Sequence, residues 1–502
     1  TAPSSTSTVK QPLPSTRIIS MYRLSAACVF FLIAPICHAI QVRPPNVVLV
    51  FVDDMGWGDF SCFGNAAVQT QNIDRLANEG IRFEQFYVNS PICSPSRVAI
   101  STGQYPQRWK ITSYLASRTL NEERGMAQWL DPQAPMLARI LQRNGYATGH
   151  FGKWHMGGQR DVGEAPLITE YGFDKSLTNF EGLGPRVLAI CDAHDGKPVR
   201  RHTLGSDTLG RGEIIWQDRA KVTESYTTAA VDFIKQAEQS DKPFYINLWP
   251  DDVHSPFYPP EARRADGSKR NLYHGVLDTM DEQLGVLFDY IRGRETLRDN
   301  TLILVCSDNG PERGAGTAGP LRGYKTWLYE GGIRSSLIAW GPGVLQTPTP
   351  GKPNLHSFFA AIDLPPTLLA IADIRVPDDV HFDGHALPNV LLGKVDESRP
   401  SALFFRRPPD RKSFYGDSNL PDLAVRDRNW KFLCDYDGSR PQLYNLDTDR
   451  GEMNNVAGDH PELVKDLSQR LLAWHRKMPA DNGANFRVNG AKGQPKKTPA
   501  NN

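Results

Sequence analysis

The sequence predicts an α/β protein with a large, mainly parallel or mixed sheet between helices, followed by a small antiparallel sheet that carries one helix. Three observations predict this. Four short apolar runs each end in polar residues, and helical patterns separate these runs. Near the C-terminus, two further apolar runs flank a turn and precede an amphipathic stretch. Alternation of strands and helices is typical of a parallel sheet covered on both faces, and the last pattern is typical of a hairpin followed by a helix.

Length and composition exclude several classes of protein. The chain has 502 residues, of which 40% are hydrophobic, with 57 Lys and Arg against 56 Asp and Glu. This length fits two or three domains, or one large α/β unit with an appendage. The balanced charge argues against a nucleic-acid partner, which a basic excess would indicate. Seven cysteines are too sparse for a disulfide scaffold. With these classes excluded, we expect a globular protein and most simply an enzyme.

The N-terminal region resembles an export signal rather than part of a fold. Met21 and Arg23 precede the apolar run Ala26–Ile36, and the segment Cys37–Ala39 that follows ends in the small residue Ala39. This order is typical of a signal peptide, and the run is too short for a membrane span. The alternative, a buried strand or helix, has no obvious pairing partner. We therefore expect Met21 as the true start, a mature protein beginning near Ile40 with no membrane span, and an exported location. That location would be periplasmic, extracellular or, in a eukaryote, a secretory lumen.

The four apolar runs deliver polar side chains to one place. Asn46–Val52 is followed by Asp53 and Asp54, and Ala147–Phe151 by Lys153 and His155. Phe244–Leu248 is followed by His254, and Thr301–Cys306 by Asp308 and Asn309. Continuous apolar runs are typical of strands buried on both faces of a parallel sheet. Because ligands bind beyond the carboxyl ends of such strands, we expect a functional site there.

Helical patterns and one long insertion lie between the strands. Met136–Asn144 has helical apolar spacing with Gly145 as its C-terminal cap, and a second apolar stripe extends from Val276 to Ile291. Leu177–Asp218 is too long for a simple connection, so we expect it to shape a substrate pocket.

The C-terminal part predicts a smaller α+β unit. Ala424–Cys434 and Gln442–Leu446 are expected as strands on either side of a turn at Asp435–Arg440, and Pro461–Lys477 as a helix. We expect four segments: an export region (1–39), a catalytic domain (40–394), a C-terminal subdomain (395–480) and a disordered tail (481–502).

The acidic residues at two of the strand ends predict a metal site. Asp53, Asp54, Asp308 and Asn309 offer only oxygen ligands. Crowded carboxylates repel one another unless a cation neutralises them, and all-oxygen ligation suits Ca²⁺ or Mg²⁺ better than Zn²⁺. The alternative is that each Asp caps the helix after its strand.

Several motifs together resemble the sulfatase family. Cys93–Gly103 (CSPSRVAISTG) is similar to the signature C-x-P-S-R with a Thr-Gly ending, and Gly145–His155 is similar to the second signature, G-Y-x-T…G-K-x-H. Further matches are Val52–Asp59, Ser307–Gly310 and Gln442–Asn455. The resemblance extends from about Pro45 to Met478. It is to formylglycine-dependent sulfatases of the arylsulfatase and N-acetylgalactosamine-6-sulfatase kind, within the alkaline phosphatase superfamily.

The resemblance implies a cofactor set. Cys93 would be oxidised to formylglycine (3-oxoalanine) by a maturation enzyme, and the hydrated aldehyde would be the nucleophile. Asp53, Asp54, Asp308 and Asn309 would bind the metal, usually Ca²⁺, with Mg²⁺ as the alternative. The modified Cys93 would complete the metal's ligand shell.

The resemblance also implies roles for five further residues. Arg97 would hold the formylglycine hydrate, and Lys153 and His155 would surround the sulfate and the aldehyde. His254 would protonate the leaving oxygen, and Lys325 would be a second sulfate-binding lysine.

The resulting hypothesis is a sulfuric ester hydrolase that acts on a sulfated carbohydrate or an aryl sulfate. Two alternatives remain open. One is a phosphonate monoester or phosphodiester hydrolase of the same superfamily. The other is a non-catalytic relative that binds glycans. His194, His202, His381 and His385 match no motif and are expected on the surface or in a substrate pocket.

Overall fold

A mixed, eight-stranded sheet organises the molecule. The computed structural model describes residues 43–410 and 419–483. The expected export region therefore lies outside the described residues, as does the expected tail from residue 484 on. The sheet has the order β11-β2-β10-β9-β1-β8-β3-β4. Its strands are β1 (Asn46–Val52), β2 (Ile81–Tyr87), β3 (Ala147–Gly152), β4 (Lys175–Leu177), β8 (Phe244–Trp249), β9 (Thr301–Ser307), β10 (Arg334–Trp340) and β11 (Pro353–Ala360).

All four strands expected from apolar runs form, and they lie side by side. β1 pairs in parallel with β8 and with β9, and β8 pairs in parallel with β3. β10 is antiparallel to both β9 and β2, which makes the sheet mixed. The expected fold class is confirmed. Because β9, β1, β8 and β3 run in the same direction, their carboxyl ends meet at one edge.

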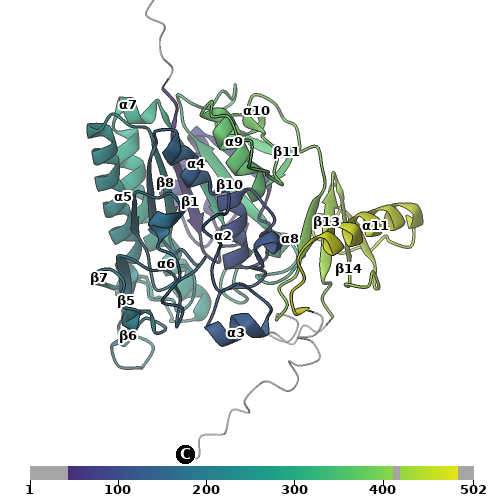
Figure 1. The fold of residues 1–502 in the computed structure, drawn as a ribbon, viewed down its shortest axis with the longest axis horizontal. Coiled ribbons are helices and arrows are strands. Elements are labelled where there is room, and N and C mark those ends of the chain that lie inside the picture. The colour runs from purple at the N-terminus through teal and green to yellow at the C-terminus, as the bar shows by residue number, and fades with distance from the viewer. Residues whose placement is uncertain (1–42, 411–418, 484–502) are drawn as a thin grey trace, which may run out of the picture. The chain divides into compact units, whose positions relative to one another are not determined.

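Both faces of this sheet are covered by helices (Figure 1). The face with Val48, Val50 and Val52 packs on α1 (Gln71–Glu79), α5 (Val222–Gln239) and α6 (Lys269–Arg292). The face with Val47, Leu49 and Phe51 packs on α2 (Cys93–Thr102), α4 (Leu137–Arg143) and α9 (Leu364–Ile371). Successive side chains of a strand point to opposite faces, so a strand buried on both sides must be apolar throughout.

The expected helices also form. α4 lies within Met136–Asn144, and Gly145 follows it with φ 91°, a left-handed conformation that glycine adopts without strain. α6 contains the whole stripe from Val276 to Ile291. The shorter helices are α3 (Arg118–Glu123), α7 (Glu295–Arg298), α8 (Glu330–Ile333) and α10 (Pro388–Leu391). Among the described residues, no helix is both long and apolar enough to cross a membrane.

The long insertion contains a small sheet of its own that the sequence did not predict. β5 (Arg186–Cys191) pairs in parallel with β7 (Ile214–Asp218) and antiparallel with β6 (Arg200–His202). β7 leads directly into Arg219 and then into α5. The insertion is thus an ordered part of the fold.

The C-terminal part is a four-stranded antiparallel sheet with one helix, as expected for the fold class. Its strands are β12 (Leu403–Arg406), β13 (Leu423–Asp427), β14 (Trp430–Cys434) and β15 (Gln442–Asn445), and α11 (Pro461–Lys477) packs on them. Figure 1 shows α11 beside β13 and β14. The domain boundary near residue 394 stays a prediction.

One expected element is wrong. Ala424–Cys434 is not one strand but the hairpin of β13 and β14, in which Asp427 lies opposite Trp430. Arg428 and Asn429 form the connection, and Arg428 adopts φ 53°. A two-residue hairpin loop needs left-handed backbone, which Gly or Asn usually supplies at the first position. Arginine gives no such signal, so the sequence hides the turn.

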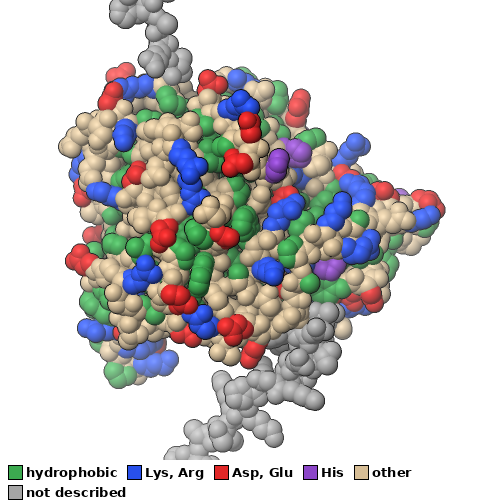
Figure 2. All heavy atoms as spheres, in the orientation of Figure 1, with side chains coloured by type: hydrophobic (Ala, Val, Ile, Leu, Met, Phe, Trp, Pro, Cys, Tyr) green, Lys and Arg blue, Asp and Glu red, His purple; other side chains and the backbone are tan. Residues whose placement is uncertain are grey.

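Charged side chains of both signs are interspersed on the face seen in Figure 2. This distribution agrees with a formal net charge of +1 for the whole chain.

Candidate active site

Backbone hydrogen bonds between neighbouring strands continue just beyond the strand ends and hold the residues that follow the central strands. The amide of Asp53 donates to Pro250 O (3.1 Å), and that of Asp308 donates to Val52 O (3.0 Å). The amide of Lys153 donates to Trp249 O (2.9 Å). These bonds extend the parallel ladders by one step, so the side chains just beyond them occupy fixed positions at the sheet edge.

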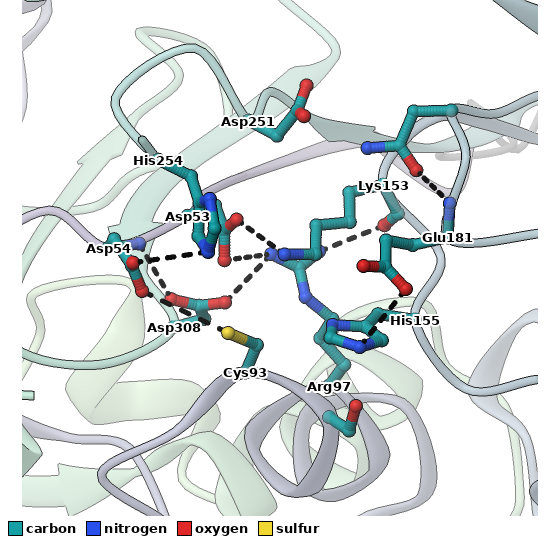
Figure 3. A network of polar contacts seen from close by, with 12 residues as sticks. Asp53, Asp54, Cys93, Arg97, Lys153, His155, Glu181, Asp251, His254 and Asp308 are labelled. Atoms are coloured by element: carbon teal, nitrogen blue, oxygen red, sulfur yellow. Dashed lines mark hydrogen bonds and ion pairs between the residues drawn. The ribbon is translucent and has the colours of Figure 1, made fainter. Parts of the chain in front are cut away.

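Arg97 connects two of the carboxylates. Its Nη2 lies 3.1 Å from Asp53 Oδ1 and 2.8 Å from Asp308 Oδ2, and its Nη1 donates to Lys153 O (2.9 Å). None of the three side chains Arg97, Asp53 and Asp308 is exposed. The guanidinium also lies 5.2 Å from the ring centroid of Trp249. Arg97 thus fixes the spacing of the carboxylates (Figure 3).

Two lysines reach the same cluster from other elements. Lys153 Nζ lies 2.7 Å from Asp53 Oδ2, and Lys325 Nζ lies 2.5 Å from Asp54 Oδ2. Asn309 Nδ2 donates to Asp54 Oδ1 (2.9 Å). The Oδ1 atom of Asn309 is buried and has no hydrogen-bond partner among the described residues. That oxygen is therefore available to a ligand.

The charges in this cluster perturb one another strongly. Burial alone would raise the pKa of Asp53, but Lys153, His254 and Arg97 together hold the pKa well below its usual value. Burial, with the Asp53 carboxylate beside it, raises the pKa of Asp308 well above its usual value. Carboxylates this close together repel one another, and a bound cation would relieve that repulsion.

The cluster has the donors that a hard divalent cation requires. Oxygen or sulfur atoms of Asp53, Asp54 and Cys93 all lie within 4.8 Å of one another. With Asp308 and the free Oδ1 of Asn309, the donors are carboxylate and amide oxygens, which suit Ca²⁺ or Mg²⁺. The four oxygen-bearing residues therefore fit a metal of this type, whereas the sulfur of unmodified Cys93 is a soft ligand that does not suit it.

Cys93 is the first residue of α2. It is buried, and its Sγ lies 3.9 Å from Asp54 Oδ1. Burial raises the pKa of the Cys93 thiol, and the negative charge of Asp53 raises it further. An unmodified Cys93 would hence stay a neutral thiol, which is a weak nucleophile.

Two histidines flank the cluster. His254 Nε2 lies 3.5 Å from Asp54 Oδ2, and its Nδ1 is 2.8 Å from Ser255 O. Since a carbonyl only accepts, Nδ1 carries a hydrogen, and Nε2 is the nitrogen turned towards Asp54. His155 Nε2 lies 2.9 Å from Leu115 O. Burial lowers the pKa of both histidines.

Two site residues have left-handed backbone conformations. Asp54 has φ 59° and His155 has φ 53°. Such conformations cost energy for residues other than glycine and persist where the surroundings enforce them. Here both of them occur directly after a strand end, where the chain turns to point a polar side chain into the site.

A cavity of about 310 Å³ lies over these residues. Six predicted site residues line it: Asp54, Cys93, Lys153, His155, His254 and Lys325. The other four, Asp53, Arg97, Asp308 and Asn309, contact members of this group from behind. The structure thus brings all ten predicted site residues together.

The rest of the cavity wall comes largely from residues that sequence reasoning did not assign. The region of the long insertion supplies Phe180, Glu181, His202 and Leu204. His202 was expected on the surface or in a pocket, and it lies in the pocket. Glu181 was missed. It is buried, its Oε2 lies 3.2 Å from His155 Nε2, and burial raises its pKa to about 7 although Arg160 and Lys153 oppose the rise. No motif surrounds Glu181, so only folding reveals its place.

An α/β sheet whose strand ends carry carboxylates, lysines and histidines around one cavity fits a hydrolase of the alkaline-phosphatase-like class, and the family matches agree. Residues 45–374 match the family described as Sulfatase, and residues 323–477 match the family described as N-sulphoglucosamine sulphohydrolase, C-terminal. The chain belongs to the sulfatase family and is a sulfuric ester hydrolase.

Several curated proteins are similar over most of the chain. Human arylsulfatase A is 31% identical over 465 residues, which are 86% of this chain and 87% of that protein. N-acetylgalactosamine-6-sulfatase of Sus scrofa is 32% identical over 380 residues, 73% of this chain and 69% of that protein. N-acetylgalactosamine-6-O-sulfatase of Bacteroides thetaiotaomicron is 29% identical over 505 residues, 86% and 93% of the two chains.

A solved structure, Ps i-CgsB in complex with k-i-k-neocarrahexaose, has the same fold. The TM-score is 0.72 at 24% identity, and the match covers 90% of this chain and 98% of the other.

Proposed function

We propose that this enzyme removes sulfate from a sulfated carbohydrate, using a divalent cation, a formylglycine formed from Cys93, and His254 as the acid for the leaving group. The observation that carries the proposal is the cluster of ten side chains at one cavity, with carboxylates, lysines and two histidines in contact. The family supplies the reaction class, sulfate ester hydrolysis.

Metal binding is assigned to Asp53, Asp54, Cys93, Asp308 and Asn309. The free Oδ1 of Asn309 and the raised pKa of Asp308 support this assignment. A bound cation would give that oxygen a partner and would favour the charged form of the Asp308 carboxylate. Ca²⁺ is the proposed ion, with Mg²⁺ as the alternative. When bound, the cation supplies electrostatic stabilisation for the charged oxygens of a sulfate group.

The nucleophile is assigned to position 93. Its hydrated aldehyde form would supply an oxygen nucleophile for sulfur, and a formylglycine-generating enzyme is the implied partner. The place of Cys93 at the start of α2 supports this, since the N-terminus of a ten-residue helix favours a negatively charged group.

Lys153 and Lys325 are proposed to bind the sulfate. Both Nζ atoms already contact the carboxylates, and both residues line the cavity. For both lysines, burial favours the neutral form, but Asp53 beside Lys153 and Asp54 beside Lys325 outweigh it and raise the pKa. Two fixed positive charges can therefore stabilise negative charge as it spreads over the sulfate oxygens.

His254 is proposed as the proton donor. Because Nδ1–H donates to Ser255 O, the acid would be the doubly protonated imidazolium: Nε2 gives its proton to the leaving oxygen as the ester S–O bond breaks, and the imidazole is left neutral with its hydrogen on Nδ1. Arg97 is proposed to hold the carboxylates and the side chain of residue 93 in place. His155, which lines the cavity together with Lys153, is proposed to contact the sulfate and the aldehyde.

A sulfated sugar is the proposed substrate class. The relatives include proteins named N-acetylgalactosamine-6-sulfatase, and a fold neighbour was solved with a carbohydrate. The cavity has polar side chains suited to sugar hydroxyls, among them Glu181, His202 and Arg160, together with the ring of Tyr114. Because arylsulfatase A is also a relative, we expect aryl sulfates to be accepted too. Export through a signal within residues 1–39 is part of the proposal.

Activity on p-nitrophenyl sulfate and on a panel of sulfated disaccharides tests the proposal, with Cys93→Ala as the control. We expect hydrolysis of both substrate types by the enzyme and loss of both in the variant. Undiminished activity in Cys93→Ala would refute the nucleophile. Faster turnover of a matched phosphonate ester than of the sulfate ester would favour the alternative hydrolase.

A further inference from the structure

Arg219 lies behind the loop that carries His254, and none of the motifs includes it. It is the residue that directly follows β7, at the end of the long insertion, and its side chain is 5% exposed. It also lines a second cavity of about 630 Å³. A buried arginine at the end of an insertion needs partners, and its partners belong to the His254 loop.

The guanidinium of Arg219 binds this loop at several points. Its Nη2 donates to Asp251 O (2.5 Å), and it lies 3.3 Å from His254 O and 3.5 Å from Asp252 O. Its Nη1 lies 3.3 Å from Asp251 Oδ1, a carboxylate that is only 3% exposed. Figure 3 shows Asp251 and His254 on one loop. A single planar group thus gathers the backbone oxygens on both sides of Val253.

We propose that Arg219 is a positioning residue that fixes His254 for proton transfer to the leaving group. Among the described residues the imidazole makes one hydrogen bond, from Nδ1 to Ser255 O of the same loop, besides the 3.5 Å contact of its Nε2 with Asp54 Oδ2. The direction of Nε2 therefore depends on the path of residues 251–255. Arg219 also binds the carbonyl of His254 itself. Without the guanidinium the loop would be held less firmly, so Nε2 would be less precisely oriented although the imidazole is still present. This inference rests on the proposed role of His254.

A lysine in place of Arg219 is the first test. Lysine keeps the positive charge, but its single nitrogen cannot take the place of both Nη2, which contacts the carbonyls, and Nη1, which lies beside the Asp251 carboxylate. The measurement is kcat/KM for a series of aryl sulfates whose leaving phenols have increasing pKa. An acid catalyst matters most for poor leaving groups, so defects in proton transfer steepen the fall of log kcat/KM with leaving-group pKa.

We expect Arg219→Lys to lower kcat/KM about 10-fold for phenyl sulfate and at most about 2-fold for p-nitrophenyl sulfate. His254→Ala should give the same pattern with a larger loss, about 100-fold for phenyl sulfate. In the double variant, Arg219→Lys should add no further leaving-group dependence, because the group that it positions is absent.

Arg399→Lys is the matched control. Arg399 is also buried, lies 3.1 Å from the Asp363 carboxylate and donates to Ser401 O and Ala402 O, but it binds no part of the His254 loop in the contacts described for it. This variant should show the wild-type leaving-group dependence even if it loses stability. If Arg219→Lys does not fold, Arg219→Gln combined with Asp251→Asn removes both buried charges together and should show the same steepened dependence.

The outcomes separate the two hypotheses. A steeper dependence in His254→Ala with a wild-type dependence in the Arg219 variants would overturn the positioning role alone. A wild-type dependence in His254→Ala itself would refute the acid role of His254, and the role of Arg219 with it.

Discussion

Replacing Arg97 by lysine tests how the carboxylate cluster is held together. In the wild-type protein the guanidinium makes three contacts, at 2.8 Å to Asp308, 3.1 Å to Asp53 and 2.9 Å to Lys153 O, and its side chain is fully buried. In the wild type Nη2 contacts both carboxylates while Nη1 contacts the carbonyl; lysine has one nitrogen on an unbranched chain, and we expect it to keep only one of the two carboxylates. The variant therefore loses one hydrogen bond to a charged group, about 1.5–3 kcal/mol, and one to a carbonyl, about 0.5–1.5 kcal/mol.

We accordingly expect Arg97→Lys to lower the free energy of unfolding by about 2–4.5 kcal/mol, measured by urea denaturation at pH 7 in the presence of a chelator. Arg375→Lys is the control, since the ion pair of Arg375 with Asp378 is more than four-fifths exposed and should change stability by less than about 0.5 kcal/mol. Sulfatase activity should fall about 100-fold or more, because Asp53 and Asp308 lose their fixed spacing. If Arg97→Lys were as stable and as active as the wild type, the role assigned to these contacts would be wrong.

Three further predictions concern pH, metal and the C-terminal hairpin. Burial lowers the pKa of His150 to about 3 from its ordinary value of 6.5. The unfolded chain therefore takes up a proton below pH 6.5 while the folded protein does not, so stability falls as the pH drops from 6.5 towards 3. Between pH 6.5 and 5 the wild type should lose about 1.6 kcal/mol more than His150→Gln in urea denaturation, and equal losses would contradict the assignment. Adding Ca²⁺ at about 100 times its Kd to chelator-treated enzyme should stabilise it by about 2.7 kcal/mol, and Asn309→Leu should lose most of that gain; an unchanged gain would remove Asn309 from the metal site. Arg428→Gly should raise the free energy of unfolding by up to about 1 kcal/mol, since Arg428 holds φ 53°, and a lower Tm would show that its side chain matters more than its backbone.

The central strands and the site could be predicted because their signals are local. β1 and β9 are continuous apolar runs, since both faces of each strand are buried, and the polar residues come directly after them. In a parallel arrangement such ends must meet. The positions of Asp53 and Asp308 could therefore be predicted from the sequence alone.

Other features depend on contacts that the sequence does not encode locally. β2 and β10 give no continuous apolar signal, since polar residues alternate in β2 and Ser335 and Ser336 interrupt β10. Glu181 and Arg219 belong to the region of the long insertion, so their partners are fixed only by the folding of a segment without a motif. The hairpin at Arg428 was missed because its turn lacks a glycine.

The mass of the peptide that contains Cys93, taken from active enzyme of its native source, tests the central claim most directly. We predict a peptide lighter than the cysteine form by the difference between a thiol-bearing and a formyl-bearing side chain, together with loss of sulfatase activity in Cys93→Ala. An unmodified cysteine at position 93 in fully active enzyme would contradict the proposed mechanism.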